Sequence, residues 1–228
     1  RKARGRKEST MFDDYRVERI NPKDTKDFIL NKHYAKRMPP ISYAFGLMRG
    51  DSLQGVLTIG KPASNSLCEG VCGKEYKSQV YELNRLVVND GLPKNILSYF
   101  VSRVLRSLKD QDLILVSYAD EGANHHGYIY QATNWIYTGK TKERTDKYVP
   151  GGKHSRHYTN ENNHIRKVRS PKHRYIYFTN RKRLKEYMKL LKYPIVKEYP
   201  KGDNERYVLG ERIGDKIINT QTQEVWYE

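Results

Sequence analysis

The sequence predicts a mixed α/β fold with a central sheet, flanking helices and a basic C-terminal extension. Three observations predict this class. Alternating residues over 42–59 indicate a pair of strands, apolar residues at helical spacing over 96–108 indicate a long helix, and the apolar run at 113–118 is typical of a buried strand. Several strands precede the long helix, which differs from the strand–helix alternation of a doubly wound sheet.

The chain begins with a basic arm, residues 1–20, whose first ten residues fit either a solvated tail or a phosphate-binding arm. Asn21 followed by Pro22 then predicts the start of a helix, because Asn caps the first turn and Pro fits its first position. Apolar residues at 28–30 continue this helix, which we expect to end near His33.

Two strands are expected at 42–48 and 53–59, joined by a tight turn as a hairpin. Residues 60–73 are rich in small side chains and predict a loop. This loop carries both cysteines of the sequence, Cys68 and Cys72. Two cysteines at this spacing form neither a disulfide framework nor a complete zinc site, so we expect reduced thiols.

The next strand is expected at 81–88 and carries polar and basic residues among its apolar ones. Strict alternation places Leu83, Arg85 and Val87 on one face of this strand and Glu82 on the other. A strand with such a polar face often lines a functional site.

The long helix at 96–108 follows a loop at 90–95 with the sequence Asp-Gly-Leu-Pro-Lys-Asn. Free amides and the positive end of the dipole at a helix start attract phosphate, and Lys94 and Ser98 add a charge and a hydroxyl there. The segment predicts either a phosphate site that includes Lys94, Asn95 and Ser98, or an ordinary helix start that Asn95 caps.

The buried strand at 113–118 leads into Asp120. An Asp at the carboxyl end of such a strand faces the crevice in which α/β proteins bind ligands. Its carboxylate is a candidate general base or metal ligand, and the alternative is a helix-capping role. His33 and Tyr34 form a second candidate, because His supplies a base or a ligand nitrogen and Tyr can stack on a nucleobase. The alternative is that this pair has no functional role.

The rest of the chain adds shorter elements. These elements are a helix at 128–133, a strand at 135–137, a closing strand at 174–178, a helix at 182–191 and a hairpin element within 207–227. The loop before the first of them contains His125 and His126, which we expect in solvent. We therefore divide the chain into the basic arm 1–20, a catalytic domain 21–180 and an accessory C-terminal segment 181–228.

The charge of the chain identifies a class of partner. Lys and Arg number 43 against 26 Asp and Glu, which gives a formal net charge of +17 and a pI near 9.7. Such an excess favours polyanionic partners, of which nucleic acid is the most common. No apolar run approaches the roughly 20 residues that a membrane span needs, and the first residues do not resemble a signal peptide. We expect a cytoplasmic protein that does not bind membranes.

Cations and aromatic rings alternate along residues 153–175. Nucleic-acid binding requires this combination, because cations bind phosphates and rings stack on bases. The alternative is a solvated run of charges. The predicted nucleic-acid-binding residues are Arg37, Lys153, His154, Arg156, His157, Tyr158, Arg169, Lys172 and Arg174.

Several of these segments, in this order and at these spacings, resemble the phage Mom DNA-modification proteins. The resemblance covers about residues 30 to 178 and includes His-Tyr at 33–34 and Ser-Tyr-Ala-Asp at 117–120. Its most specific parts are Glu-Leu-Asn-Arg at 82–85 and Tyr-Gln-Ala-Thr-Asn at 130–134.

The resemblance implies a fold like that of the GNAT acyltransferase superfamily. It also implies an enzyme that converts adenine in phage DNA to an N6-carbamoylmethyl (acetamido-type) adenine and so protects it from host restriction. Double-stranded DNA in the cytoplasm of the infected bacterium is then the partner, and the target base is expected to flip into a crevice. The matching functional positions are His33, Tyr34, Asp120 and Tyr130.

Two cofactors follow from the resemblance. One is iron, with His33 and Asp120 as ligands. The other is acetyl-CoA or another small-group donor, bound at Lys94, Asn95, Ser98 and Arg85. The usual Gly-rich pyrophosphate loop is replaced here by Leu-Pro-Lys-Asn at 92–95, which argues against ordinary use of CoA.

Two other functions remain as alternatives. One is a GNAT-like acyltransferase that acts on a protein or a small molecule, although such an enzyme would not need the basic stretch at 153–175. The other is a non-catalytic DNA-binding protein, which would not need a carboxylate at the end of a buried strand. The sequence leaves the oligomeric state open, including a homodimer.

Overall fold

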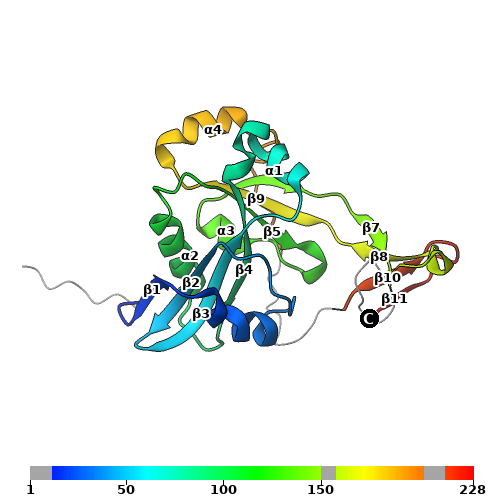
Figure 1. The fold of residues 1–228 in the computed structure, drawn as a ribbon, viewed down its shortest axis with the longest axis horizontal. Coiled ribbons are helices and arrows are strands. Elements are labelled where there is room, and N and C mark those ends of the chain that lie inside the picture. Colours follow the sequence, from blue (N-terminus) through cyan, green and yellow to red (C-terminus); the bar gives the residue numbers. More distant parts are fainter. Residues whose placement is uncertain (1–11, 150–157, 203–213) are drawn as a thin grey trace, which may run out of the picture.

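The computed structural model describes residues 12–149, 158–202 and 214–228. The described residues form a seven-stranded sheet of order β1-β2-β3-β4-β5-β9-β6 and a four-stranded sheet of order β11-β10-β8-β7 (Figure 1). Helices pack on both faces of the larger sheet. The predicted mixed α/β fold is confirmed.

All neighbouring strands of the larger sheet are antiparallel except β4 and β5, which run parallel. The predicted hairpin at 42–59 is confirmed as β2 and β3. The strands are β1 (Tyr15–Arg19), β2 (Tyr43–Arg49), β3 (Ser52–Gly60), β4 (Val80–Val88), β5 (Ile114–Asp120), β9 (Lys172–Phe178) and β6 (Ile136–Lys140).

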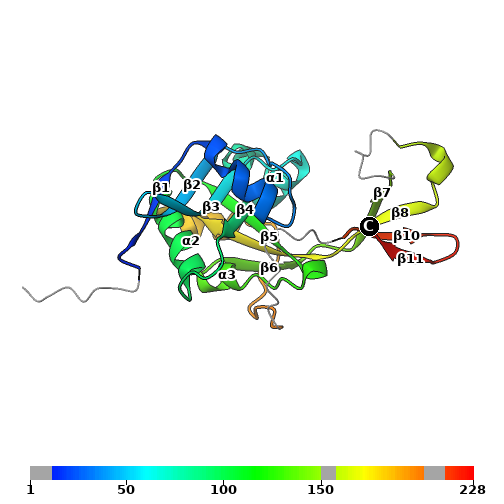
Figure 2. The ribbon, with the colours of Figure 1, turned by 90° about the horizontal axis from the view of Figure 1, so that it is seen from below.

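The predicted long helix is confirmed as α2 (Ile96–Ser107), whose apolar side fills the main core together with α3 (Tyr128–Ala132). The other face of the sheet carries α1 (Asn65–Cys72) and α4 (Leu184–Leu190) over a second apolar cluster. Figure 2 shows α2 and α3 on the same side of the sheet. Burial of these two clusters fixes the strands that carry the candidate site.

The predicted loop at 60–73 is wrong, because α1 occupies most of it. The Ser64 side chain accepts a hydrogen bond from the amide of Leu67 and caps this helix. Cys68 and Cys72 lie one turn apart on its buried side, where both are free thiols as expected. Burial raises the pKa of Cys72 to about 11, so this thiol stays protonated at neutral pH.

The predicted N-terminal helix forms as two short turns, a 3-10 turn (Pro22–Thr25) and a π-helix (Phe28–Lys32). Asn21 caps the first turn by accepting from the amide of Lys23. The π-helix ends where the amide of His33 donates to the carbonyl of Phe28. Short π-helical turns are common at functional sites, and this one places His33 against β4.

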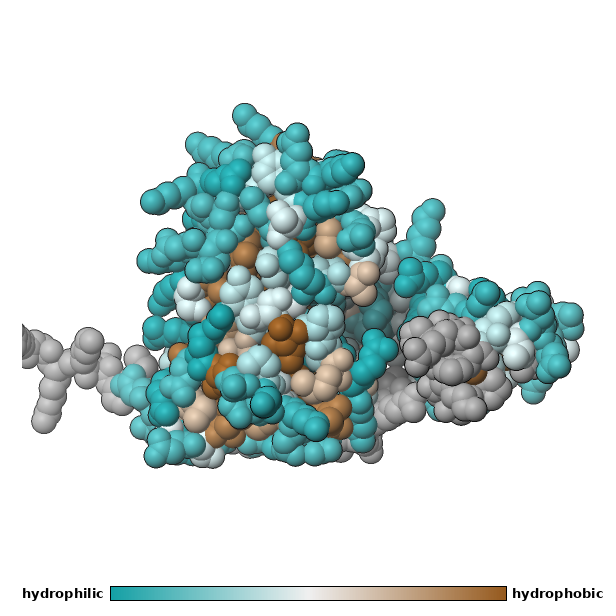
Figure 3. All heavy atoms as spheres, in the orientation of Figure 1, coloured by the Kyte–Doolittle hydropathy of each residue, from teal (hydrophilic) through white to brown (hydrophobic). Residues whose placement is uncertain are grey.

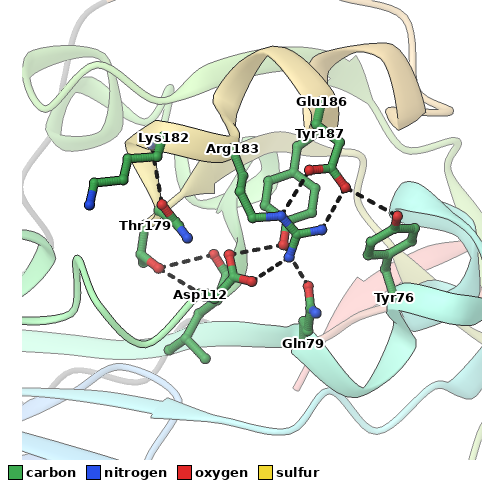
Figure 4. Close-up of polar contacts among 10 residues, drawn as sticks. Tyr76, Gln79, Asp112, Thr179, Lys182, Arg183, Glu186 and Tyr187 are labelled. Carbon is green, nitrogen blue, oxygen red and sulfur yellow. Dashed lines mark hydrogen bonds and ion pairs between the residues drawn. The ribbon is translucent and has the colours of Figure 1, made fainter.

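The segment after residue 180 begins with a 3-10 turn (Arg181–Arg183) and α4, which agrees with the helix predicted at 182–191. Figure 4 shows the polar network that attaches α4 to the sheet. Arg183 forms ion pairs of 2.5 Å with both Asp112 and Glu186, and the buried Tyr187 hydroxyl lies 2.9 Å from Asp112. The chain then returns along β6, where the amide of Val196 donates to a backbone carbonyl.

The smaller sheet projects from the body of the molecule (Figures 1 and 2). We call this sheet the arm; it is distinct from the N-terminal segment 1–20. Along the chain, β7 follows β6 of the larger sheet and β8 precedes β9 of that sheet. The hairpin β10–β11 pairs with β8 and extends the arm. The hairpin predicted within 207–227 is thus confirmed for its described part. The arm consists of β7 (Arg144–Lys147), β8 (Ile165–Arg169), β10 (Lys216–Asn219) and β11 (Val225–Tyr227).

In the described residues, no helix is both long and apolar enough to cross a bilayer.

Candidate active site

The larger sheet opens between β4 and β5. Their parallel pairing covers only Val80–Glu82 on β4, although β4 continues to Val88 and β5 continues to Asp120. Beyond the split, the Ser117 hydroxyl lies 2.9 Å from the carbonyl of Leu83 and replaces a backbone bond of the ladder. Open α/β sheets bind ligands at such carboxyl ends of strands, and the predicted site residues gather here.

A β-bulge in β4 shapes one side of this split. Thr58 on β3 pairs with Arg85, whereas the next residue, Ile59, pairs with Leu83, so Asn84 is the extra residue. The side-chain oxygen of Asn84 accepts a hydrogen bond of 2.6 Å from Thr58, which holds the bulge in place.

The bulge changes which β4 side chains share a face. Glu82 pairs with Gly60 and Arg85 with Thr58, and these two β3 residues lie on the same face because they are two apart. Glu82 and Arg85 therefore point to one face, where Val87 also packs. The face assignment expected from strict alternation, with Arg85 beside Leu83 and opposite Glu82, is wrong for this reason.

Arg85 is a partly buried cation whose hydrogen bonds go to backbone carbonyls. Its guanidinium donates to the carbonyls of Asn84 at 2.6 Å and Arg37 at 3.0 Å, and its Nε is buried with no hydrogen-bond partner. No carboxylate of the described chain lies within ion-pair distance of it. Burial lowers the pKa of Arg85, and burial likewise raises the pKa of nearby Glu82. A guanidinium with a buried unpaired donor is suited to an oxygen of a bound ligand.

His33 lies beside Arg85 and is 5% exposed. The amide of Ala35 donates a 3.0 Å hydrogen bond to its Nδ1. Burial, followed by the charges of Arg85 and His125, lowers the pKa of His33 to about 3. The ring is therefore neutral at physiological pH, with Nδ1 in the acceptor form.

Tyr34 stacks on His33 with 4.4 Å between ring centroids and meets His125 edge-on at 5.8 Å. Burial raises the pKa of Tyr34, and the nearby charges of Asp120 and Glu82 raise it further. The phenol is protonated at neutral pH. His125, which we expected in solvent, instead forms one side of this aromatic group.

Tyr130 approaches the split from α3 and is almost completely buried. Its hydroxyl lies 2.7 Å from the Ser117 hydroxyl, which also lies beside the Leu83 carbonyl. A serine has one proton to donate, so Tyr130 donates to Ser117 whenever Ser117 donates to that carbonyl. Burial strongly raises the pKa of Tyr130, so it is a proton-bearing group at the split.

Asp120 lies at the end of β5 with both carboxylate oxygens occupied. One oxygen accepts from the Gly122 amide at 3.0 Å and from the Ser170 hydroxyl, and the other forms a 2.9 Å ion pair with Lys172. Its backbone carbonyl accepts from the amide of His125. The capping alternative thus describes its contacts, and Asp120 positions the loop that carries His125.

These donor atoms do not fit an iron site formed by His33 and Asp120. Nδ1 of His33 faces an N–H donor, and the carboxylate of Asp120 already accepts from Gly122, Ser170 and Lys172. The described residues also contain no group of three or more His, Cys, Asp and Glu arranged to hold a metal. The predicted iron site at His33 and Asp120 therefore has no support in the contacts of these residues.

The start of α2 lies at the same end of the sheet as the split. Asn95 adopts a left-handed conformation with φ of 67° and does not cap the helix, which argues against the ordinary capping alternative. Among the described residues, the amides of Leu97 and Ser98 have no hydrogen-bond acceptor, and Lys94 is exposed beside them. The Ser98 hydroxyl donates 2.8 Å to the Asn95 carbonyl. These groups fit a phosphate of a bound donor.

Several cations predicted to bind nucleic acid are used inside the fold. Lys172 pairs with Asp120, Arg169 pairs with Asp146 at 2.7 Å, and Arg174 lies 3.4 Å over the ring of Tyr193. Arg37 is exposed, and Tyr158 donates 2.7 Å to Asn163. Four predicted positions lie outside the described residues: Lys153, His154, Arg156 and His157.

Sequence reasoning did not name Glu82, Ser117 or His125 as site residues. Glu82 and Ser117 lie within the segments that carry the family resemblance, but their positions at the split depend on where the β4–β5 pairing ends. His125 is brought in by the backbone bond to Asp120, which no sequence pattern indicates.

Comparison with known proteins gives the family. Residues 14–201 match the Mom protein family. A similar protein is the methylcarbamoylase Mom of Escherichia phage Mu, which is 32% identical over 130 residues, 55% of this chain and 54% of the relative. The chain thus aligns with about half the length of this curated relative.

Solved structures similar to this chain include acetyltransferases. The ribosomal-protein-S5-alanine acetyltransferase of Vibrio fischeri has a TM-score of 0.47 at 11% identity and covers 75% of this chain and 96% of that one. A Bacillus subtilis acetyltransferase solved with CoA has a TM-score of 0.41 at 12% identity, with coverages of 72% and 98%. The match over residues 14–201, which contains every residue of the split, establishes that the chain belongs to the Mom protein family.

Proposed function

We propose that this protein transfers a carbamoylmethyl (acetamido-type) group to N6 of adenine in double-stranded phage DNA, at the split between β4 and β5. One observation carries the proposal: the buried Nε of Arg85 has no partner, and Arg85 lies near the neutral side chains of His33 and Tyr34. Family membership supports a transferase that modifies DNA.

The reaction forms a bond between adenine N6 and the methylene carbon of the group. The leaving group departs from that carbon with the bonding electron pair and takes up one proton. N6 releases one proton to water, from which the proton donor is restored. Tyr130 is the candidate to protonate the leaving group, because its raised pKa keeps it protonated and its proton is free when the Ser117 hydroxyl donates to the phenol oxygen. Arg85 is the candidate to hold the amide oxygen of the transferred group through its unpaired Nε.

The acceptor base must leave the duplex to reach this site, since its N6 lies within the base stack. The stacked rings of His33 and Tyr34 offer an aromatic surface for a flipped adenine. A neutral His33 is suited to this role, because a charged ring would be costly to bury beside Arg85.

A phosphate-bearing donor fits the start of α2. For the step above, it must carry its leaving group on the methylene carbon, as a carbamoylmethyl donor does. Acetyl-CoA does not provide this step by itself, because its thiolate leaves from the carbonyl carbon and it has no amide nitrogen. The free amides of Leu97 and Ser98, with Lys94, would hold its phosphate, and the split would receive its reactive end. When bound, the donor supplies the activated carbon.

The test is mass spectrometry of nucleosides from plasmid DNA of expressing cells. We expect a modified deoxyadenosine with the wild type and a large loss of it with His33→Ala, Asp120→Ala or Tyr130→Phe, while each variant still binds DNA. Modification that persists in these variants would show that the site is assigned wrongly. Resistance of the DNA to restriction enzymes is the expected consequence in the host cytoplasm.

The two other candidate functions give different results in the same experiment. An acyltransferase acting on a protein or a small molecule would leave the nucleosides unmodified and label another acceptor. A non-catalytic DNA-binding protein would leave both unchanged. The polar groups gathered at the split favour an enzyme over the latter.

A further inference from the structure

The arm begins beside the candidate active site. The strands that lead into it are joined at their base by two hydrogen bonds between Thr141 and Lys172, and Lys172 pairs with Asp120. Ser170, in the turn between β8 and β9, donates to the same carboxylate. Figure 3 shows a hydrophilic surface over the arm, which projects from the body.

The two faces of the arm differ in how their cations are neutralised. On one face, Lys167 forms an ion pair with Asp215 and Arg169 forms one with Asp146. Lys167 pairs with Asp146 of β7 and with Ile217 of β10, and paired residues of neighbouring strands point the same way. Arg169 lies two residues after Lys167 and therefore points to the same face. Arg144, which aligns with Arg169, lies on the same face and forms no ion pair in the described chain, so two of the three cations of this face are neutralised within the fold.

The opposite face, called the basic face, carries three cations and no acidic strand residue. Lys147 pairs with Arg166 in the β7–β8 register, and Arg166 pairs with Ile218 of β10, so their side chains point together. Lys216 pairs with Tyr227, which is 69% exposed. In the described chain, none of these three cations forms an ion pair. The basic face consists of Thr145, Lys147, Arg166, Val168, Lys216, Ile218, Val225 and Tyr227.

We propose that the basic face of the arm binds the phosphate backbone of the duplex beside the target adenine. The inference rests on the proposed function, since it takes duplex DNA as the substrate. Cations without acidic partners keep their full charge for phosphates, and an exposed tyrosine adds contact area. Two-stranded β-ribbons are a known way to approach DNA.

The length of the arm fits this role. β8 begins seven positions before Lys172, the ion-pair partner of Asp120. At ~3.3 Å per strand residue, the far end of β8 therefore lies roughly 20 Å from Asp120. One turn of DNA rises about 34 Å, so the arm reaches phosphates within about half a turn of the base in the split. Contacts at that distance would fix the register of the duplex and leave the flipped base free to enter.

The test compares two variants of equal charge. One is the arm variant Lys147→Ala/Arg166→Ala/Lys216→Ala. The control is Lys182→Ala/Lys185→Ala/Lys189→Ala, which removes three exposed cations at α4. Dissociation constants for a 20-base-pair duplex are measured between about 50 and 200 mM salt.

Each lost phosphate contact lowers the slope of log affinity against log salt by about 0.9, so the arm variant should lose about 2 to 3 from that slope. The control should change by less than 1. Equal changes in both variants would overturn the inference. The single substitution Lys147→Glu should weaken binding in the same direction, and it covers the case in which the triple variant fails to fold.

Nucleoside analysis of the same cells separates the two proposals. If the wild type leaves no modified adenine, the proposed function fails, whereas the binding comparison still decides the role of the arm. If the wild type modifies DNA and the arm variant binds DNA as the control does, only the inference about the arm fails.

Discussion

Two arginines in this molecule each lie near a glutamate and a tyrosine, but they differ in the groups to which they donate hydrogen bonds. Arg183 lies between Asp112 and Glu186 with Tyr187 at its side, and both carboxylates pair with it at 2.5 Å (Figure 4). Arg85 lies near Glu82 and Tyr34, yet it donates only to backbone carbonyls.

The ionisation of the two groups shows the difference. Hydrogen bonds to Glu186 and Asp112 raise the pKa of Arg183, whereas burial lowers the pKa of Arg85. The network around Arg183 is complete and holds α4 on the sheet. The buried Nε of Arg85 has no partner, so a ligand would complete its surroundings. Satisfied polar networks stabilise a fold, and unsatisfied ones indicate where a fold binds something.

The largest expected effect comes from replacing each arginine by methionine. Arg85→Met should reduce the rate of adenine modification by about 10³-fold, the loss typical of one electrostatic donor in an active site. Its melting temperature should not fall, because the variant removes a buried cation without an ion-pair partner. The measurements are nucleoside mass spectrometry and thermal unfolding.

Arg183→Met is the matched control for that change. It should lower the melting temperature, because Asp112 and Glu186 lose their partner, and it should leave the rate per folded molecule unchanged. A rate lost equally in both variants would contradict the assignment of Arg85.

The second prediction compares two buried tyrosines. Tyr130→Phe removes the hydroxyl beside Ser117 and should slow modification by about 10²-fold, if its proton goes to the leaving group. Tyr187→Phe removes the hydroxyl beside Asp112 and should cost about 1 kcal/mol of stability with no change in rate. Activity and urea unfolding of both variants check this. Equal rates in the two variants would remove Tyr130 from the chemistry.

The third prediction concerns pH. The pKa of His33 is about 3 in the folded protein and about 6.5 when exposed, so below pH 6.5 the unfolded chain binds a proton that the folded chain does not. The stability that a neutral His33 provides is therefore complete above about pH 7. It is lost as the pH falls towards 3, at up to about 1.4 kcal/mol per pH unit.

His33→Asn should reduce this slope in urea unfolding between pH 4 and 7, because Asn can still accept from the amide of Ala35 but does not titrate. An unchanged slope would mean that other groups, such as His125, carry the pH dependence.

The smallest effect is expected for Asp120→Asn. The amide oxygen can still accept from Gly122 and Ser170, and only the partly exposed ion pair with Lys172 is lost, at about 0–1 kcal/mol. If Asp120 acts by positioning the loop of His125, Asp120→Asn keeps most of the activity that Asp120→Ala loses. If Asp120 is a general base, the two variants are equally inactive.

Local patterns predicted the elements that frame the site. The hairpin at 42–59, the helix at 96–108 and the buried strand before Asp120 have periodicities that belong to the segment itself. The helix at 65–72 was missed because its Ser, Gly and Cys residues are also typical of loops, although Ser64 provides a capping signal.

The interior of the site could not be predicted in this way. The sequence Leu-Asn-Arg-Leu at 83–86 fits an uninterrupted strand, and only the pairing with Thr58 and Ile59 reveals the bulge that turns Arg85 towards Glu82. The distance between β4 and β5 is likewise a property of the assembled sheet. Candidate residues were therefore found individually, whereas their neighbours and charges required the structure.

The most direct test of the account is the rate of adenine modification in Tyr130→Phe and Tyr187→Phe, measured by mass spectrometry of DNA from cells that express equal amounts of folded protein. Both variants lose one hydroxyl from a buried tyrosine, and only one of the two lies at the split. The account predicts modified adenine with Tyr187→Phe and a loss of about 10²-fold with Tyr130→Phe. Modified adenine at wild-type level with Tyr130→Phe would contradict it.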